Sequence, residues 1–168
     1  MRVGVELLCF IGASVLAVLG NDQINTAVLT LHNQYRAKHG VPALVLDSEM
    51  NRYAQEWANQ LAKTSTFSHR PNNKYGENLY WGSYPGETDL QISQRGVKAW
   101  YDENKFYNYD SETVQTKALH FTQVIWRSSR RLGIGVARGN NGVYLVCNYD
   151  PRGNFVGQFR ANVPRPTG

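Results

Sequence analysis

Two runs near the C-terminus, LGIGVARG (132–139) and VYLVCNYD (143–150), alternate between apolar and other residues. A period of two predicts β-strands, and the NNG between the runs is a turn signal, so the pair is expected to form an antiparallel hairpin. One face of the first strand carries Leu, Ile and Val, whereas the other carries Gly133 and Gly135. A strand face without side chains indicates that another element packs close to its backbone.

The segments before this hairpin are mostly helical in pattern. Asp47 is a good N-cap with Glu49 in the first turn, and apolar residues follow at three- and four-residue steps from Met50 to Leu61. GENLYW (76–81) alternates like a short strand. We also expect helices at about 23–38, 90–104 and 116–124, and an extension of the sheet at 155–159. Helices before and between antiparallel strands predict an α+β layered domain.

The first twenty residues differ from the rest of the chain. Arg2 gives a basic start, residues 7–19 form an apolar run, and small residues lead to a polar stretch after Gly20. This pattern predicts a secretory signal peptide at 1–20, and the run is shorter than the roughly 17–25 residues of a membrane-spanning helix. An uncleaved membrane anchor is the alternative. Residues 21–168 are then expected to form a single domain that is secreted and extracellular.

Without the signal peptide, Cys147 is the only cysteine, so no disulfide can form within the domain. We interpret it as a buried strand residue; an intermolecular bridge and a reactive thiol are the alternatives. The chain has a net charge of +5, and Arg127, Arg130 and Arg131 lie close together. They are expected to be solvated loop charges or a weak contact for an acidic lipid or polyanion. No nucleic-acid-binding motif accompanies them.

Histidine and glutamate residues in separate segments are the candidate site. His69 and His120 come from different elements, with Glu77 on a predicted strand and Glu103 at a predicted helix end. Imidazole nitrogens and carboxylate oxygens suit zinc, and the same groups also suit a proton-relay network that acts on water. The spacing of these four residues in the sequence is compatible with either a zinc site or a proton-relay network. The other two histidines, His32 and His39, are expected to be structural or exposed.

Five segments occur in order along the chain: AQEWANQLA (54–62), GENLYW (76–81), HFTQVIW (120–126), LGIGVA (132–137) and YLVCNYDPRGN (144–154). Together they resemble the CAP superfamily, which groups cysteine-rich secretory proteins, antigen 5 allergens and pathogenesis-related proteins of the first class. The resemblance covers essentially all of 21–168. Within the superfamily it is strongest to the Golgi-associated plant pathogenesis-related group, apart from the signal peptide. There is no Met-Gly start, so myristoylation is not expected.

The resemblance implies a three-layer α-β-α sandwich with a central antiparallel sheet and a cleft. The cleft residues of the family correspond to His69, Glu77, Glu103 and His120 in this sequence. The resemblance further implies that the two histidines bind zinc or another divalent cation. The two glutamates would then hold a water or orient the imidazole rings.

Members of the superfamily bind sterols or other lipids, acidic membranes or protein receptors, so we expect a binding protein, as a monomer or weak homodimer, with no nucleic-acid partner. The aromatic segments 80–84 and 106–109 offer surface for a lipid. Two alternatives remain: a metal-dependent hydrolase or protease that uses the His/Glu cleft, and a venom-allergen-like or defence effector that needs no catalytic residue. An enzyme is the less favoured interpretation, and no residue is assigned as catalytic.

Overall fold

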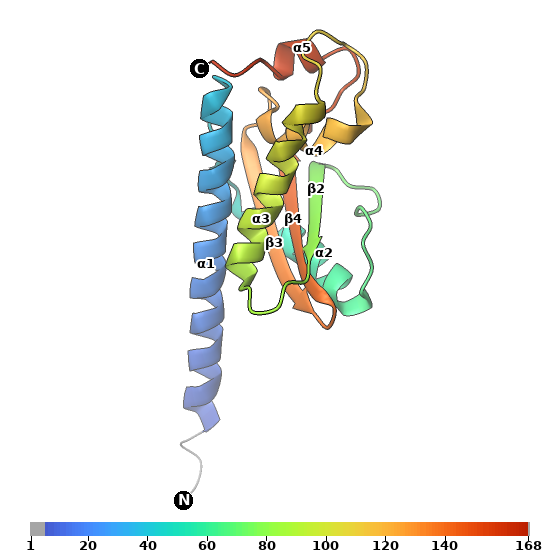
Figure 1. Cartoon of the computed structure of the whole chain (residues 1–168). Helices are drawn as coiled ribbons and strands as arrows, with labels where there is room; N and C mark the ends of the chain where they lie inside the picture. The colour runs from blue at the N-terminus through green and yellow to red at the C-terminus, as the bar shows by residue number, and fades with distance from the viewer. Residues whose placement is uncertain (1–5, 168) are drawn as a thin grey trace, which may run out of the picture.

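The computed structural model describes the backbone of residues 6–167 and the side chains of residues 22–167 (Figure 1). It contains five α-helices, four strands and two short 3₁₀ turns within the described residues. The elements are α1 Glu6–Lys38, β1 Val45–Leu46, α2 Ser48–Thr64, β2 Gly76–Gly82, α3 Asp89–Asp102, the 3₁₀ turns η1 Glu103–Phe106 and η2 Thr116–Ala118, α4 Leu119–Ile125, β3 Arg131–Gly139, β4 Gly142–Asp150 and α5 Phe159–Asn162.

The sheet has four strands in the order β1-β3-β4-β2. The predicted hairpin is confirmed as β3 and β4, and β2 pairs antiparallel with the other side of β4. The predicted antiparallel sheet is therefore present in β2, β3 and β4. The two-residue β1 adds a parallel pairing to β3 that was not predicted, so the sheet as a whole is mixed. β1 has only two residues, which is too short to give a recognisable alternation.

Residues 155–159 do not extend the sheet, contrary to prediction. Gln158 N donates to Phe155 O in a turn, and α5 begins at Phe159. Phe155 and Val156 are both exposed, so an extended strand here would have no buried face to stabilise it.

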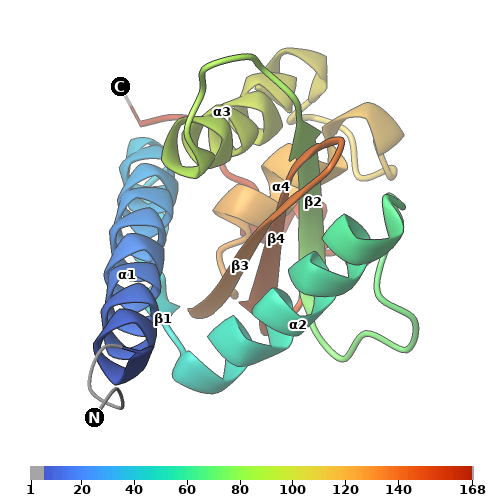
Figure 2. The same cartoon turned by 90° about the horizontal axis from the view of Figure 1, so that it is seen from below.

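Helices cover both faces of the sheet, which confirms the three-layer arrangement (Figure 2). α2 lies on one face, where Ala54, Ala58 and Leu61 form a core with β2 and β4. α1, α3 and α4 cover the other face and form the larger core. The apolar side chains of β3, at Leu132, Ile134 and Val136, belong to this larger core.

The glycine face of β3 is the surface on which α2 lies. A Cβ added at Gly133 would lie 2.4 Å from the carbonyl carbon of Met50, and one added at Gly135 would lie 2.3 Å from that of Ala54. Such distances are far inside van der Waals contact, so the helix backbone occupies the space that side chains would need. The close approach predicted from the bare glycine face is therefore confirmed. Asp47 also has its predicted role, since its side chain accepts from Met50 N at 3.0 Å.

α1 is one continuous helix from Glu6 to Lys38, so it begins within the predicted signal peptide. Residues 1–5 lie outside the described residues, as do the side chains of residues 6–21. Among the described residues, no helix has both the length and the apolar character needed to cross a membrane. Cleavage after about residue 20 stays a prediction.

A Gly135→Ala substitution tests the packing of α2 on β3. The added methyl group would force the helix away from the sheet, so we expect the free energy of unfolding to fall by about 3 kcal/mol. Urea denaturation followed by tryptophan fluorescence measures this change. Gly86→Ala is the control, because nothing lies within 4 Å of the added atom there. Its φ of +81° makes the loss about 1 kcal/mol from backbone strain alone. Equal losses for the two variants would contradict the packing account.

Candidate binding cleft

His120 is placed by the first turn of α4 and by a carboxylate from a different element. α4 has no side-chain cap of its own, because Ala118 stands at the N-cap position. Instead Glu103 Oε2 accepts from His120 N at 3.1 Å and from Phe121 N at 3.3 Å. Its other oxygen accepts from His120 Nδ1 at 2.7 Å. One carboxylate therefore caps the helix and fixes the imidazole ring at the same time.

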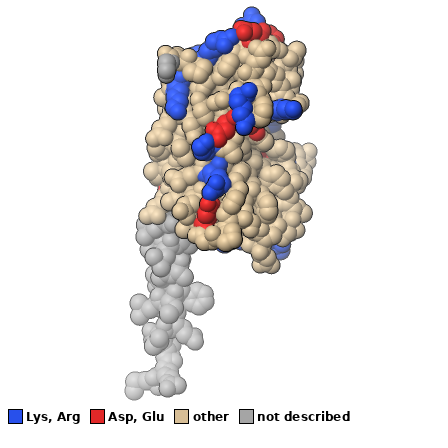
Figure 3. Space-filling model, in the orientation of Figure 1, with Lys and Arg blue, Asp and Glu red and all other residues tan. Residues whose placement is uncertain are grey.

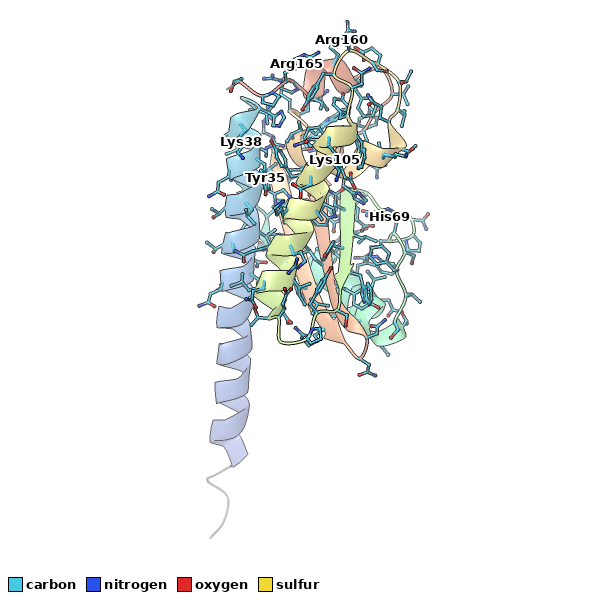
Figure 4. The ribbon with its side chains drawn as sticks, in the orientation of Figure 1. Tyr35, Lys38, His69, Lys105, Arg160 and Arg165 are labelled. Carbon is cyan, nitrogen blue, oxygen red and sulfur yellow. The ribbon has the colours of Figure 1, made fainter. Side chains whose placement is uncertain are left out.

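His69 is placed by the loop between α2 and β2, at the side of β2 (Figure 4). Its Nδ1 donates to Glu77 Oε1 at 2.8 Å. The Glu77 side chain is only 4% exposed, whereas that of His69 is 67% exposed. Glu77 also accepts from Arg70 N and from the amides of Asn73 and Asn148. The hydrogen bond from His69 to Glu77 raises the pKa of the imidazole above its usual value, against a smaller opposing effect of burial.

The structure thus arranges the four predicted residues as two His–Glu pairs. In both pairs the carboxylate can only accept, so Nδ1 carries the proton and the Nε2 lone pair is left for another partner. Within the described residues, no group of three or more His, Cys, Asp and Glu side chains is arranged to hold a metal ion. The described residues thus offer two imidazoles with an unbonded Nε2, one in each His–Glu pair.

A cavity of about 400 Å³ lies next to the His120–Glu103 pair. Its walls are mostly apolar and aromatic. They are formed mainly by Phe67, Leu79, Tyr80, Trp81, Trp100 and Tyr144, with Ser65, Ala99 and Asn141 completing the lining. His69 and Glu77 do not line this cavity. It is therefore a mainly apolar hollow, with His120 and Glu103 among its polar lining residues.

Of the two aromatic segments predicted to contact a ligand, only 80–84 reaches the cavity, through Tyr80 and Trp81. In the segment 106–109, the Tyr107 and Tyr109 rings pack against Phe121 instead. Hydrophobic rings in a sequence do not by themselves reveal whether they belong to the core or to a cavity.

A buried polar chain supports the floor of the site. Trp100 stacks on the His120 ring at a centroid distance of 6.3 Å, and its Nε1 donates to Leu79 O at 3.1 Å. Asn78 Nδ2 donates to His120 O at 3.1 Å and to the Tyr149 hydroxyl at 3.3 Å. That hydroxyl in turn donates to His32 Nε2 at 2.8 Å. Sequence reasoning missed these supporting roles, because their partners lie far apart in the chain.

His32 and His39 are both buried and structural. His32 Nδ1 donates to Val28 O at 2.8 Å, and burial lowers the pKa of this histidine to about 4. His39 Nδ1 donates to Pro164 O at 2.8 Å, and its Nε2 accepts from the Tyr101 hydroxyl at 3.1 Å. Neither histidine belongs to the cleft.

Cys147 is fully buried in β4, as predicted, and burial raises the pKa of its thiol well above the ordinary value. The arginine cluster is partly engaged within the chain. Arg131 pairs with Asp47 and Asp150, and Arg127 Nε donates to Ala161 O at 3.2 Å. On the face shown in Figure 3, Lys and Arg side chains lie among Asp and Glu side chains, so this face has no large patch of a single sign.

Comparison with known proteins settles the family. The model of the CAP family, described as the cysteine-rich secretory protein family, matches residues 29–149. The chain belongs to this family. Golgi-associated plant pathogenesis-related protein 1 of Homo sapiens is 38% identical over 152 residues, which cover 87% of this chain and 96% of the relative. Pathogenesis-related protein 1C of Nicotiana tabacum is 41% identical over 133 residues, covering 77% of this chain and 76% of the relative.

A solved structure shows the same CAP fold at lower identity. The crystal structure of NaASP2 with Zn²⁺ aligns with a TM-score of 0.67 and 23% identity, and covers 86% of both chains. The predicted CAP resemblance and its α-β-α fold are thereby confirmed. The pathogenesis-related character predicted for this CAP chain is also supported by its relatives.

The buried neutral His32 predicts a specific pH dependence of stability. The unfolded chain protonates this histidine near pH 6.5, whereas the folded protein does so only near pH 4. Stability from this group is therefore complete above about pH 6.5 and falls by about 1.4 kcal/mol per pH unit as the pH drops toward 4. Denaturation at several pH values measures the slope, and His32→Gln should make it shallower by that amount. An unchanged slope in the variant would contradict the assignment.

Proposed function

We propose that this CAP protein is a secreted, pathogenesis-related binding protein, whose cleft takes an apolar or amphipathic ligand beside a divalent cation held by His69 and His120. One observation carries the proposal. Each histidine has its Nδ1 held by a glutamate and its Nε2 left for another partner, and the His120–Glu103 pair lines a mainly apolar cavity.

The two histidines fit a divalent cation such as zinc. Imidazoles that bind zinc commonly donate their other N–H to a carboxylate, which sets the tautomer and strengthens the ligand nitrogen. Glu77 and Glu103 supply these carboxylates here. A bound cation would contribute a positive charge with open coordination positions. NaASP2, a fold neighbour, is described with Zn²⁺, which supports the proposal without deciding it.

Binding is favoured over hydrolysis because the cavity offers mainly apolar contact. Ser65 lines it and Ser68 lies next to His69, but neither hydroxyl bonds an imidazole among the described residues. A serine nucleophile activated by histidine would need such a contact. Metal-dependent hydrolysis stays the alternative, and the histidine variants below also test it.

The apolar walls of the cavity are compatible with the predicted binding of a lipid or sterol. A cavity of about 400 Å³ is within the range of small-molecule sites, and its polar lining residues His120 and Glu103 would face a ligand's polar group. An acidic membrane surface is less well supported, because Arg160 and Arg165 pair with Glu112 and Asp110.

The cation proposal predicts zinc binding that depends on both imidazoles. Isothermal titration of the untagged chain at pH 7.5 should show one equivalent of Zn²⁺. His69→Gln and His120→Gln should each weaken binding more than tenfold, and the double variant should abolish it. His39→Gln is the control, because that histidine bonds Pro164 O and the Tyr101 hydroxyl and none of the four cleft residues. Zinc binding that survives in the double variant would contradict the proposal, and zinc-dependent ester or peptide hydrolysis lost in the same variant would favour the enzyme.

The apolar cavity predicts that filling it blocks the ligand. Ala99 lines the cavity on α3, so Ala99→Trp should lower binding of a fluorescent sterol or fatty acid at least tenfold. Ala37→Trp is the matched control, because Ala37 is exposed on α1 and does not line the cavity. Fluorescence titration compares both variants with the wild type. If the wild type takes up no more probe than buffer does, the lipid ligand is rejected.

A further inference from the structure

The two edges of the sheet differ in how their outward-facing backbone groups are hydrogen-bonded. On the outer side of β3, β1 pairs with Arg131 and Leu132. Beyond the end of β1, side-chain amides of α2 bond the backbone of β3 instead. Asn51 Oδ1 accepts from Ile134 N at 2.8 Å, and Gln55 accepts from Val136 N at 3.0 Å and donates to Val136 O at 2.7 Å. On this edge, side chains of α2 therefore bond the N–H of Ile134 and both backbone groups of Val136.

The other edge is formed by β2, which pairs only with β4. In an antiparallel pair, alternate residues direct both backbone groups away from the partner strand. Gly82 O faces β4, because it would lie 2.7 Å from a Cβ added at Gly142. Leu79 and Trp81 alternate with Gly82 along the strand, so their backbone N–H and carbonyl groups point away from β4, toward the open edge. The bond from Trp100 Nε1 to Leu79 O, at 3.1 Å, agrees with this assignment.

Three outward-facing backbone groups within Leu79–Trp81 have no partner outside the sheet among the described residues. Within the described part of the chain, no group outside the sheet bonds the N–H of Leu79 or the N–H or carbonyl of Trp81. Proteins usually blunt an open edge with Lys, Pro or a bulge. β2, GENLYWG, carries neither Lys nor Pro, and its only charged residue, Glu77, is held by His69 and the loop.

The open edge coincides with the cavity. Leu79, Tyr80 and Trp81 are consecutive residues that all line it, although neighbours on a strand point to opposite faces. Phe67 and Tyr144 line it from the side of α2, and Trp100 lines it from the side of α3. The hollow therefore runs along the strand edge, with aromatic walls on both sides.

We infer that the cleft binds a protein partner through an extended peptide segment, which adds a strand along Leu79–Trp81. The inference rests on the proposed function in that this cavity is a binding site, and it names the class of partner. A lipid would cover these three outward-facing backbone groups without bonding them, which costs free energy, whereas a peptide backbone supplies matching donors and acceptors.

The walls also define which peptide fits. Side chains of an added strand alternate between the two walls, so one set would meet Phe67 and Tyr144 and the other set Trp100. Glu103, paired with His120, is the only Asp, Glu, Lys or Arg among the cavity residues. The geometry therefore selects an uncharged segment with apolar or aromatic side chains on both faces of the strand.

Two substitutions at Trp81 distinguish the contribution of its backbone N–H to peptide binding from that of its indole ring. Trp81→Ala removes the ring and keeps the N–H, whereas Trp81→Pro removes both. Proline is tolerated in edge strands where the N–H faces outward, and Trp81 is 43% exposed, so both variants should fold. Far-UV circular dichroism and urea denaturation check this directly.

Random heptapeptides displayed on phage are selected on the wild type, and an enriched peptide is synthesised for titration. We expect Trp81→Pro to bind it at least tenfold more weakly than Trp81→Ala. N-methylation at alternate peptide positions should abolish binding in one register and spare it in the other. Amide exchange at Leu79 and Trp81 should slow in the complex.

Three results would overturn the inference: no enrichment on the wild type over Trp81→Pro, equal binding by the two Trp81 variants, or equal effects of N-methylation in both registers. Concentration-dependent protection of Leu79 and Trp81 without peptide would assign the edge to a second copy of the chain instead. Zinc titration of Trp81→Pro is measured in parallel. Intact zinc binding with lost peptide binding in this variant would leave the cation proposal standing. A wild-type chain that binds the peptide in a Trp81-dependent way but binds no zinc would leave the peptide inference standing without the cation proposal.

Discussion

A single buried guanidinium joins the N-terminal helix to the part of the fold that carries the cleft. Arg36 is fully buried in α1 and donates to four backbone carbonyls, those of Pro42, Val124, Trp126 and Ser129. Burial lowers its pKa to about 10, so it still carries its charge at neutral pH. Unmade hydrogen bonds are costly inside a protein, and a planar group with five donors satisfies several loop carbonyls at once. No carboxylate is among its bonded partners in the described residues.

The cleft depends on this contact because α4 has only seven residues and could not hold its position alone. Arg36 binds carbonyls at the C-terminal end of α4, and Glu103 caps its N-terminal end. His120 is in the first turn of α4, so its position is set by two charged groups from other elements. The apolar residues of HFTQVIW pack beneath it: Phe121, Val124, Ile125 and Trp126 are all at most 1% exposed. A segment that looks like ordinary core thus fixes one residue of a site.

Local patterns in the sequence were sufficient for much of the fold. The Gly133 and Gly135 face predicted a close neighbour, and Asp47 predicted the start of α2; both depend on contacts that a short segment reveals. The parallel pairing of β1 was not predictable, because two residues have no period. The set of four cleft residues, His69, Glu77, Glu103 and His120, came from family resemblance, and their arrangement as two His–Glu pairs came only from the structure. The support from His32 was missed because its hydroxyl partner, Tyr149, lies 117 residues away.

The same reasoning explains why the open edge of β2 stands out only in three dimensions. As a sequence, GENLYWG is a good strand with an exposed tryptophan, and nothing in it tells an edge strand from a central one. The strand order places it at the edge, and the amides of Asn51 and Gln55 show that this fold does close an edge when helix side chains are within reach. No such side chain covers Trp81 among the described residues. Because the walls there are aromatic and His120 lines the same hollow, the simplest physical role for the gap is to receive another backbone.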